Sequence, residues 1–240
     1  MVKQASEGKD LKKFAYFLPN TFTALNMGCG FFSIIFVQKG LFHQACMLLL
    51  LGSIFDSVDG RVARITGTES AFGEQFDSLS DVISFGIAPA FIIYNRFLFD
   101  HGRFGMVICF LFCLAGSLRL ARFNANIDRV DPSYFQGLPI PAAAMALIGY
   151  CLLSLEFSFP FPQSYFTIPF VLIYAFLMIS NIPFYSFKKS TWIKNHPKWM
   201  LLILILVFCL IFIYEQIMIF SVIITYTLLC LGNYGINLKK

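Results

Sequence analysis

The sequence predicts an all-α fold: a polytopic integral membrane bundle of about eight transmembrane helices around a cytoplasm-facing cavity. Three observations predict it, namely the composition, the length of the apolar runs and the distribution of basic residues. The 240 residues are 58% hydrophobic and only 13% charged, whereas a soluble domain is nearer half apolar and a quarter charged. A compact soluble protein of this size could not bury so much apolar surface, so lipid must cover it.

Apolar runs of about 20 residues, long enough to cross a bilayer, recur along the chain. We expect eight spans, at residues 20–38, 41–65, 74–95, 104–123, 137–156, 164–184, 199–214 and 216–232. The last two are short and meet at Tyr214 and Glu215, so one long bent helix or a tight hairpin is the alternative there. No cleavable signal peptide is expected, because the first 13 residues are polar and no small-residue cleavage site follows the first span.

The lysines and arginines predict the orientation in the membrane. With the N-terminus in the cytoplasm, fifteen of the 18 fall on the cytoplasmic side, and only Lys39, Arg96 and Arg103 fall on the other. We therefore expect a multi-pass protein of the cytoplasmic membrane with both termini in the cytoplasm. The net charge of +5 then suits an anionic lipid leaflet. No basic stripe with interleaved aromatics is present, so nucleic acid is not an expected partner.

The sequence divides into three expected regions. Residues 1–19 form a Lys-rich, amphipathic cytoplasmic arm that Pro19 ends, residues 20–184 form the core, and residues 185–240 form a basic cytoplasmic loop and the last helices. The arm can lie on the membrane surface, although a partly disordered tail is an equal alternative. Its apolar face consists of Leu11, Phe14, Ala15 and Leu18.

Four aspartates interrupt the apolar pattern of the second and third predicted spans, where charge is costly. Asp56 and Asp59 are three residues apart on one helix, so they share a face. Asp77 and Asp81 are four apart on the next helix and also share a face. The short loop 65–73 makes the helices antiparallel neighbours with all four carboxylates near the cytoplasmic ends. Four such charges repel one another, so cations must lie among them, and oxygen ligands without nearby Cys or His favour Mg²⁺ or Mn²⁺.

Small and basic residues beside these aspartates indicate chemistry on a phosphorylated substrate. Gly60 and Ala63 continue the stripe of the first aspartate pair, so a bulky diphosphate could approach the helix backbone, and Gly73 opens the next helix in the same way. Arg64 offers a guanidinium fork suited to phosphate. Two cations held here would clamp phosphoryl oxygens during an in-line displacement.

The stretch DSVDGRVARITGTESAFGEQFDSLSD, residues 56–81, resembles the signature of the CDP-alcohol phosphatidyltransferase family, D-x-x-D-G-x-x-A-R-x8-G-x3-D-x3-D. Every fixed position of the pattern is matched. The resemblance implies a membrane transferase of phospholipid biosynthesis that uses two divalent cations and acts as a homodimer. The positions that match are Asp56, Asp59, Gly60, Ala63, Arg64, Gly73, Asp77 and Asp81.

The resemblance also implies a role for each matched residue. Asp56, Asp59 and Asp77 would bind the metals, and Asp81 would touch one metal and act as the general base on the acceptor hydroxyl, where a positioned base is useful. The CDP moiety would be received by Asp56, Gly60, Ala63, Arg64 and Gly73. A Pro-Asn pair before the first span recurs in the family, so Asn20 and Thr23 are further candidates for nucleotide contacts; helix N-capping by Asn20 is the alternative.

Outside the signature, the chain is similar to the membrane-embedded phosphatidylserine synthases of bacteria and archaea. The likeness is carried by LPNTFTALNMGCGFFSI (18–34), FDSLSDVISFGIAPA (76–90), RLARFN (119–124), GLPIPAAA (137–144) and, more weakly, MISNIPFYSFK (178–188). It implies transfer of the phosphatidyl group of CDP-diacylglycerol to L-serine with release of CMP. An archaeal-type ether-lipid donor is an alternative, because the donor chains face lipid and leave little trace in a sequence.

Serine carries a carboxylate, which needs a cation. Arg119 and Arg122 are three apart near the cytoplasmic end of the fourth span, and we expect one of them to bind it. The alternative is that both are ordinary positive-inside anchors. Glycerol 3-phosphate, inositol phosphate or a second lipid are rival acceptors, although a phosphorylated acceptor would need a more basic pocket. A membrane ion transporter that uses the aspartates is a rival class, but transporters place charges near the midplane and show paired repeats.

Overall fold

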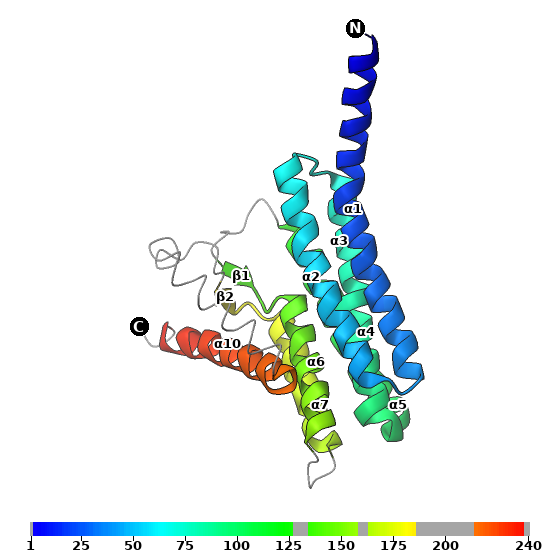
Figure 1. The fold of residues 1–240 in the computed structure, drawn as a ribbon. Helices are drawn as coiled ribbons and strands as arrows, with labels where there is room; N and C mark the ends of the chain where they lie inside the picture. The colour runs from blue at the N-terminus through cyan, green and yellow to red at the C-terminus, as the bar shows by residue number, and fades with distance from the viewer. Residues whose placement is uncertain (1, 127–133, 158–162, 186–213, 238–240) are drawn as a thin grey trace.

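A computed structural model of the chain describes residues 2–126, 134–157, 163–185 and 214–237. They form a bundle of helices with one short ribbon of two strands (Figure 1). The long helices are α1 (Val2–Gln38), α2 (Phe42–Thr66), α3 (Ala71–Asp81), α5 (Gly102–Ala125), α6 (Ile140–Glu156), α7 (Ser164–Ile179) and α10 (Glu215–Asn237). The predicted helical class is therefore confirmed for the described residues.

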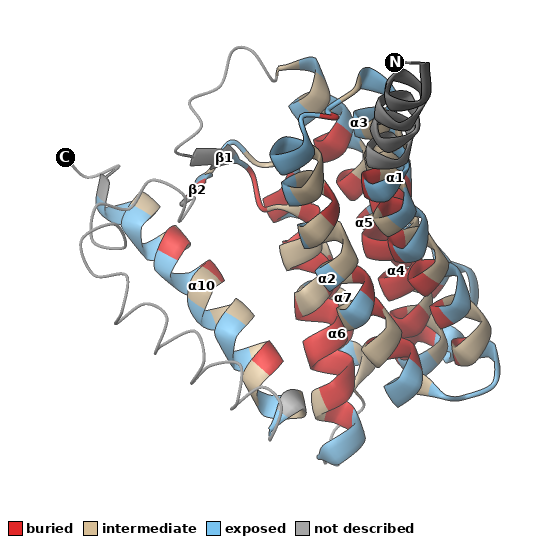
Figure 2. Cartoon of the chain, turned by 45° about the horizontal axis from the view of Figure 1, so that its top comes forward, coloured by how far each residue is buried: buried red, intermediate tan, exposed pale blue. Residues whose placement is uncertain are grey.

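Several helices match the predicted spans. In the described part of the chain, Phe17–Gln38, Ala71–Ala125 and Gln216–Ile236 are long and apolar enough to cross a membrane, and α6 and α7 are shorter apolar helices. The predicted span 199–214 and the predicted basic loop 185–198 lie outside the described residues, except for Tyr214 and for Tyr185, which ends β2. Many large apolar side chains face outward, as the exposed bands on the helices indicate (Figure 2). Examples are Phe31, Phe32, Ile54, Phe104, Phe110, Phe166, Phe176 and Leu228.

Pro19 does not end the N-terminal arm as the sequence predicted, because α1 continues through it from Val2 to Gln38. Asn20 therefore lies inside a helix and is not an N-cap. A proline inside a helix removes one donor and crowds the preceding turn, which a helix can tolerate by local adjustment. The first turns of α1 project beyond the rest of the bundle (Figure 1).

The third predicted span is a composite helix. After α3 come a π-helical segment η1 (Val82–Ile87), α4 (Ala88–Ile93), a second π segment η2 (Tyr94–Leu98) and a 3-10 turn η3 (Phe99–His101). Pro89 has no backbone donor and would clash with an ordinary α-helical turn before it. The wider turns of η1 relieve this conflict, and such π segments occur often at functional sites. Gly102, with φ 53°, then leads into α5.

Close backbone contacts fix α1, α2 and the composite helix against one another. A Cβ on Gly30 of α1 would lie 2.7 Å from the Ser84 hydroxyl of η1, so only glycine permits this approach. The Ser33 hydroxyl of α1 donates a hydrogen bond to the Ala45 carbonyl of α2 at 3.0 Å. On the other side of the bundle, a Cβ on Gly149 of α6 would lie 2.8 Å from the Phe220 backbone nitrogen of α10.

A two-stranded antiparallel ribbon departs from the predicted all-helical fold. Strand β1 (Tyr134–Gln136) pairs with β2 (Pro183–Tyr185), and Phe135 lies opposite Phe184. Neither segment has the length or the alternation that would reveal a strand in the sequence. The ribbon joins the two loops that follow α5 and α7, so it fixes the ends of both helices.

Candidate active site

The four aspartates come together at one level of the bundle, where α2 and α3 both pack against α1. One carboxylate oxygen from each of Asp56, Asp59 and Asp77 lies within 4.8 Å of the others. Asp81 lies one turn after Asp77 on α3 and interacts electrostatically with Asp56 and Asp77, so the fourth aspartate belongs to the same cluster. The predicted sharing of helix faces is thus confirmed, and the antiparallel arrangement of α2 and α3 puts both pairs at one level of the bundle.

Asp59 is the most firmly held of the four and is only 5% exposed. The Thr23 hydroxyl of α1 lies 2.8 Å from Asp59 Oδ2 and donates to it, and the Gly60 backbone N–H donates to Asp59 Oδ1. Thr23 therefore orients a cluster aspartate. Thr23 was predicted to contact the nucleotide. It does line the pocket, and its hydroxyl group hydrogen-bonds to Asp59.

The cluster has the donor set and the unused ligand atoms that a divalent cation needs. Asp77 Oδ1 and Asp81 Oδ1 are buried and have no hydrogen-bond partner among the described residues. Carboxylate oxygens without thiolate or imidazole suit Mg²⁺ and Mn²⁺. No salt bridge within the described part of the chain neutralises these acids. The residues present therefore fit the predicted divalent cations.

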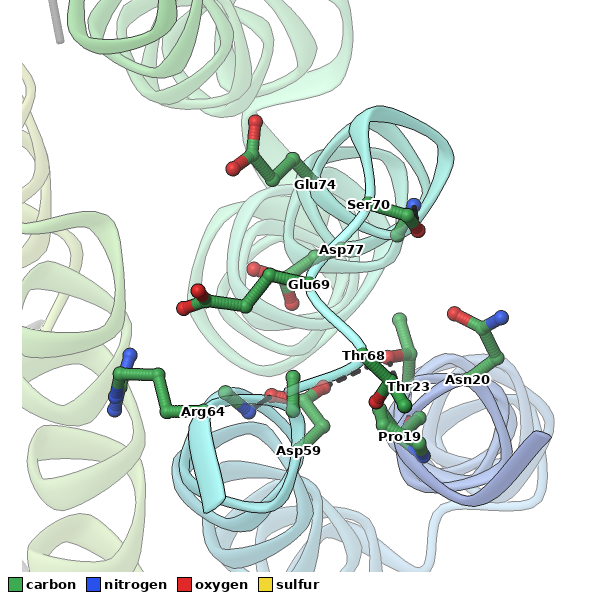
Figure 3. A pocket seen from close by; sticks show the side chains of 13 residues that line it. Pro19, Asn20, Thr23, Asp59, Arg64, Thr68, Glu69, Ser70, Glu74 and Asp77 are labelled. Atoms are coloured by element: carbon green, nitrogen blue, oxygen red, sulfur yellow. Dashed lines mark hydrogen bonds between the residues drawn. The ribbon is translucent and has the colours of Figure 1, made fainter. Parts of the chain in front are cut away.

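A pocket opens beside the cluster, between α1, α2 and the N-terminal end of α3 (Figure 3). Asp59 and Asp77 lie at its floor, and Arg64 extends from α2 at its edge (Figure 3). Of the residues predicted to contact the nucleotide, all but Asp56 line it. The full lining is Pro19, Asn20, Thr23, Asp59, Gly60, Ala63, Arg64, Thr68, Glu69, Ser70, Gly73, Glu74 and Asp77.

The two glycines of the signature leave the helix backbones open to a ligand. A Cβ on Gly60 would meet only the Arg64 guanidinium, at 3.6 Å, so the space above this helix turn is otherwise free. A Cβ on Gly73 would lie 3.2 Å from Ser70 Oγ and 3.5 Å from Asn20 Oδ1, which makes that wall narrower. A bulky group can therefore approach α2 more closely than α3.

Sequence reasoning missed part of the pocket wall. Ser70 caps α3, because its Oγ accepts a hydrogen bond from the Gly73 N–H at 3.1 Å. Thr68 and Glu69 lie in the loop that precedes it. A serine three residues before the first helical glycine is an N-cap signal that could have located this helix start. The N-terminal end of α3 therefore lies at the pocket, and its partial positive charge favours an anion there.

The two candidate arginines have different surroundings. Arg119 is only 7% exposed, its Nε has no hydrogen-bond partner within the described residues, and its guanidinium lies 5.5 Å from the centre of the Phe123 ring. It interacts electrostatically with Asp81. Arg119 lies on α5 and does not line the nucleotide pocket.

Arg122 holds the protein together at the ribbon. Its guanidinium donates to the backbone carbonyls of Ile179 (2.7 Å), Gln136 (3.0 Å), Met178 (3.2 Å) and Ser180 (3.2 Å), and to Asn181 Oδ1 (3.2 Å). These bonds join the end of α5 to β1 and to the end of α7. With its donors engaged in this way, Arg122 is a structural residue, and of the two arginines only Arg119 has a guanidinium that faces the acids.

The matched signature, the carboxylate cluster and the adjoining pocket now define the class. Residues 16–182 match the family of CDP-alcohol phosphatidyltransferases, and the chain belongs to this family. The predicted resemblance is thereby confirmed over most of the chain.

Individual proteins that resemble this chain carry more specific names than the family does. The chain is 42% identical over 178 residues to a CDP-diacylglycerol–serine O-phosphatidyltransferase of Helicobacter pylori, an alignment that covers 74% of this chain and 75% of that protein. It is 44% identical over 131 residues to the enzyme of that name from Methanocaldococcus jannaschii, covering 55% and 58%. It is also 43% identical over 137 residues to an archaetidylserine synthase of Methanothermobacter thermautotrophicus, covering 56% and 58%.

Proposed function

We propose that this protein is a phosphatidylserine synthase that transfers the phosphatidyl group of CDP-diacylglycerol to the hydroxyl of L-serine and releases CMP. The observation that carries the proposal is the pocket whose floor holds Asp59 and Asp77 and whose wall is opened by Gly60. The relatives named for this reaction support serine as the acceptor. Transfer to glycerol 3-phosphate or inositol phosphate is the alternative that the experiment below separates.

The nucleotide half of the donor belongs in the pocket between α1, α2 and α3. Its diphosphate approaches the α2 backbone at Gly60, where a side chain would obstruct it, and lies near Arg64 and the amide end of α3. Asn20 and Ala63 complete the nucleotide contacts. The acyl chains then extend from the pocket toward the lipid around the bundle.

Asp56, Asp59, Asp77 and Asp81 would hold two divalent cations, Mg²⁺ or Mn²⁺. When bound, such cations polarise phosphoryl oxygens and neutralise charge that develops at the phosphorus. The protein supplies the position of the carboxylates: Thr23 orients Asp59, and the packing of α2 and α3 against α1 brings the acids of the two helices together.

Asp81 acts as the general base of a direct displacement. The serine hydroxyl oxygen bonds to the lipid-bearing phosphorus, the bond from that phosphorus to the oxygen of CMP breaks, and the hydroxyl proton passes to Asp81. The carboxylate is buried at 8% exposure with one oxygen unpartnered among the described residues, so it has an oxygen available for the proton. No covalent intermediate is expected, because no Cys or His of the described residues lines the pocket, and the Ser70 hydroxyl that does line it caps α3.

Arg119 binds the serine carboxylate. It is buried, interacts electrostatically with Asp81 and does not line the nucleotide pocket, so donor and acceptor would reach the cluster from different places. A guanidinium suits a carboxylate because two parallel N–H groups can bind both oxygens. With its carboxylate bound by Arg119, serine would present its hydroxyl group to Asp81.

The site belongs at the cytoplasmic face of the cytoplasmic membrane, within a bundle of eight spans whose two termini are cytoplasmic. The excess of lysine and arginine on that side supports this orientation. The family also leads us to propose a homodimer, which chemical crosslinking in membranes would detect as a doubled mass.

The test is release of CMP by the purified, detergent-solubilised protein supplied with CDP-diacylglycerol, Mn²⁺ and L-serine. We expect serine-dependent CMP that EDTA abolishes and excess Mn²⁺ restores, and a loss of at least about a hundredfold in Asp81→Asn, in line with the contribution of a general base. Asp100→Asn, at the exposed turn before α5, is the matched control and should keep full activity. CMP release only with glycerol 3-phosphate or inositol phosphate would change the acceptor, and no release with any of them would refute the function.

A further inference from the structure

Asn26 lies at the centre of the bundle with an unsatisfied carboxamide. Its side chain is 0% exposed, and neither Oδ1 nor Nδ2 has a hydrogen-bond partner among the residues that the structure describes. A buried amide without partners is unfavourable, and such a group in a folded protein calls for an explanation. An apolar side chain of the same size would fill this position at lower cost if packing were its only role.

The backbone around Asn26 is fixed without help from its side chain. The Ser84 hydroxyl of η1 donates to the Asn26 backbone carbonyl at 2.8 Å, and one turn earlier the Ser80 hydroxyl of α3 donates to the Thr23 carbonyl at 3.1 Å. Any residue at position 26 would offer this carbonyl. The side chain is therefore not needed to join α1 to the composite helix.

The carboxamide lies against α2, one turn before the first aspartate of the cluster. A Cβ on Gly52 of α2 would be 3.0 Å from Asn26 Oδ1, so the carboxamide rests on the α2 backbone one turn before Asp56. That turn corresponds to a rise of about 6 Å along the helix axis. Thr23, three residues before Asn26 on α1, already touches the cluster through Asp59.

Side-chain direction brings the two groups toward each other. Side chains in an α-helix tilt toward the N-terminus of their own helix. The helices α1 and α2 run in opposite directions (Figure 1). By this rule the Asn26 side chain leans toward Thr23, the residue of α1 that contacts Asp59, and the Asp56 side chain leans toward Gly52. The amide of Asn26 and the underside of the carboxylates consequently face the same small region.

We infer that Asn26 is a positioning residue of the metal site: when the cations are bound, its amide N–H group donates hydrogen bonds to the Asp56 and Asp81 carboxylates and holds them in the geometry that binds the metals. The inference rests on the proposed function, since it takes the aspartates as metal ligands. Groups that orient metal ligands in this way commonly change metal affinity by ten- to a hundredfold when removed.

The experiment measures Mn²⁺ binding directly, by titration of the detergent-solubilised protein with electron paramagnetic resonance of the free ion, together with thermal unfolding. We expect Asn26→Leu to raise the Mn²⁺ dissociation constant about ten- to a hundredfold without lowering the melting temperature. Ser33→Ala is the matched control: Ser33 is equally buried in the same α1–α2 interface, two turns further from the cluster. It should leave Mn²⁺ affinity unchanged.

A second variant separates donation by the amide from metal ligation by its oxygen. Asn26→Asp keeps the shape and one oxygen but loses the donor, so it should also weaken Mn²⁺ binding. Retained or tighter Mn²⁺ binding in Asn26→Asp would overturn the inference, as would unchanged affinity in Asn26→Leu. In both cases the wild-type protein still binds Mn²⁺; a wild type that binds none would instead refute the proposed function, and this inference with it.

Discussion

Arg119 and Arg122 stand three residues apart on one helix, carry the same charge and have separate structural roles. Arg122 donates to four backbone carbonyls and one amide oxygen at the ribbon. Arg119 is buried beside the acids with an unpartnered Nε within the described residues. Sequence spacing placed both on one helix face, and only the positions of the neighbouring loops distinguish them.

Replacement of these arginines should affect different measurements. Arg119→Ala removes a charge-assisted hydrogen bond to the acceptor, worth about 1.5–3 kcal/mol, so the KM for serine should rise roughly ten- to a hundredfold while the KM for CDP-diacylglycerol stays unchanged. Arg119→Lys should recover only part of the loss, because an ammonium does not form the bidentate pair. Steady-state kinetics of CMP release at varied serine provides the measurement.

Arg122→Ala is the comparison for that experiment. Its loss should lower the melting temperature, because it leaves several carbonyls without a donor, and the enzyme that remains folded should keep a normal KM for serine. If Arg119→Ala showed the wild-type KM for serine, the assignment of the carboxylate to Arg119 would be wrong.

At the scale of elements, short irregular segments position the helices that carry the site. The Ser70 cap sets where α3 begins, and the π turns of η1 let the composite helix continue past Pro89. The ribbon of β1 and β2 fixes the ends of α5 and α7. Each of these segments makes only a few backbone contacts. They affect the site indirectly, because they set the positions of the helices that carry its residues.

Gly137, directly after β1, is predicted to be essential for the ribbon. Its φ is 78°, and an added Cβ would collide with the Met178 carbonyl oxygen and lie 2.9 Å from Arg122 Nη2. Gly137→Ala should therefore lower the free energy of unfolding by more than the strain of a left-handed residue alone, which is about 1–2 kcal/mol. The melting temperature should fall accordingly. Thermal unfolding in detergent measures the effect.

Gly102→Ala is the control, because Gly102 also has a positive φ, 53°, but nothing lies within 4 Å of the added carbon. It should show the backbone strain without the collision. Equal melting temperatures for the two variants would mean that the close contact at Gly137 contributes nothing to stability.

At the scale of the whole molecule, the helix bundle meets two conditions. It must expose apolar side chains to lipid, and it must collect the polar groups of the site at one end. The outward-facing phenylalanines and leucines satisfy the first condition (Figure 2). The second is met where α1, α2 and α3 meet. Charge is tolerated there because the carboxylates are gathered around a pocket and do not face the hydrocarbon.

Labelling can test which side of the membrane the pocket faces. Glu69, at the pocket, and His101, at the turn before α5, are exposed and lie at opposite ends of the composite helix. In a cysteine-free variant, Glu69→Cys should react with an impermeant maleimide only in inside-out vesicles, and His101→Cys only in right-side-out vesicles. The reverse pattern would place the pocket on the outer face and contradict the proposed orientation.

The sequence by itself determined the helical membrane class and the four acids, because period and spacing on a helix place residues such as Asp56 and Asp59 on one face whatever the surroundings. It also indicated the glycines that open the pocket. Tertiary structure alone decided which arginine faces the acids, that α1 runs through Pro19, and that Asn26 lies against α2 without a partner among the described residues. These features depend on contacts between residues far apart in the chain, which local spacing does not encode.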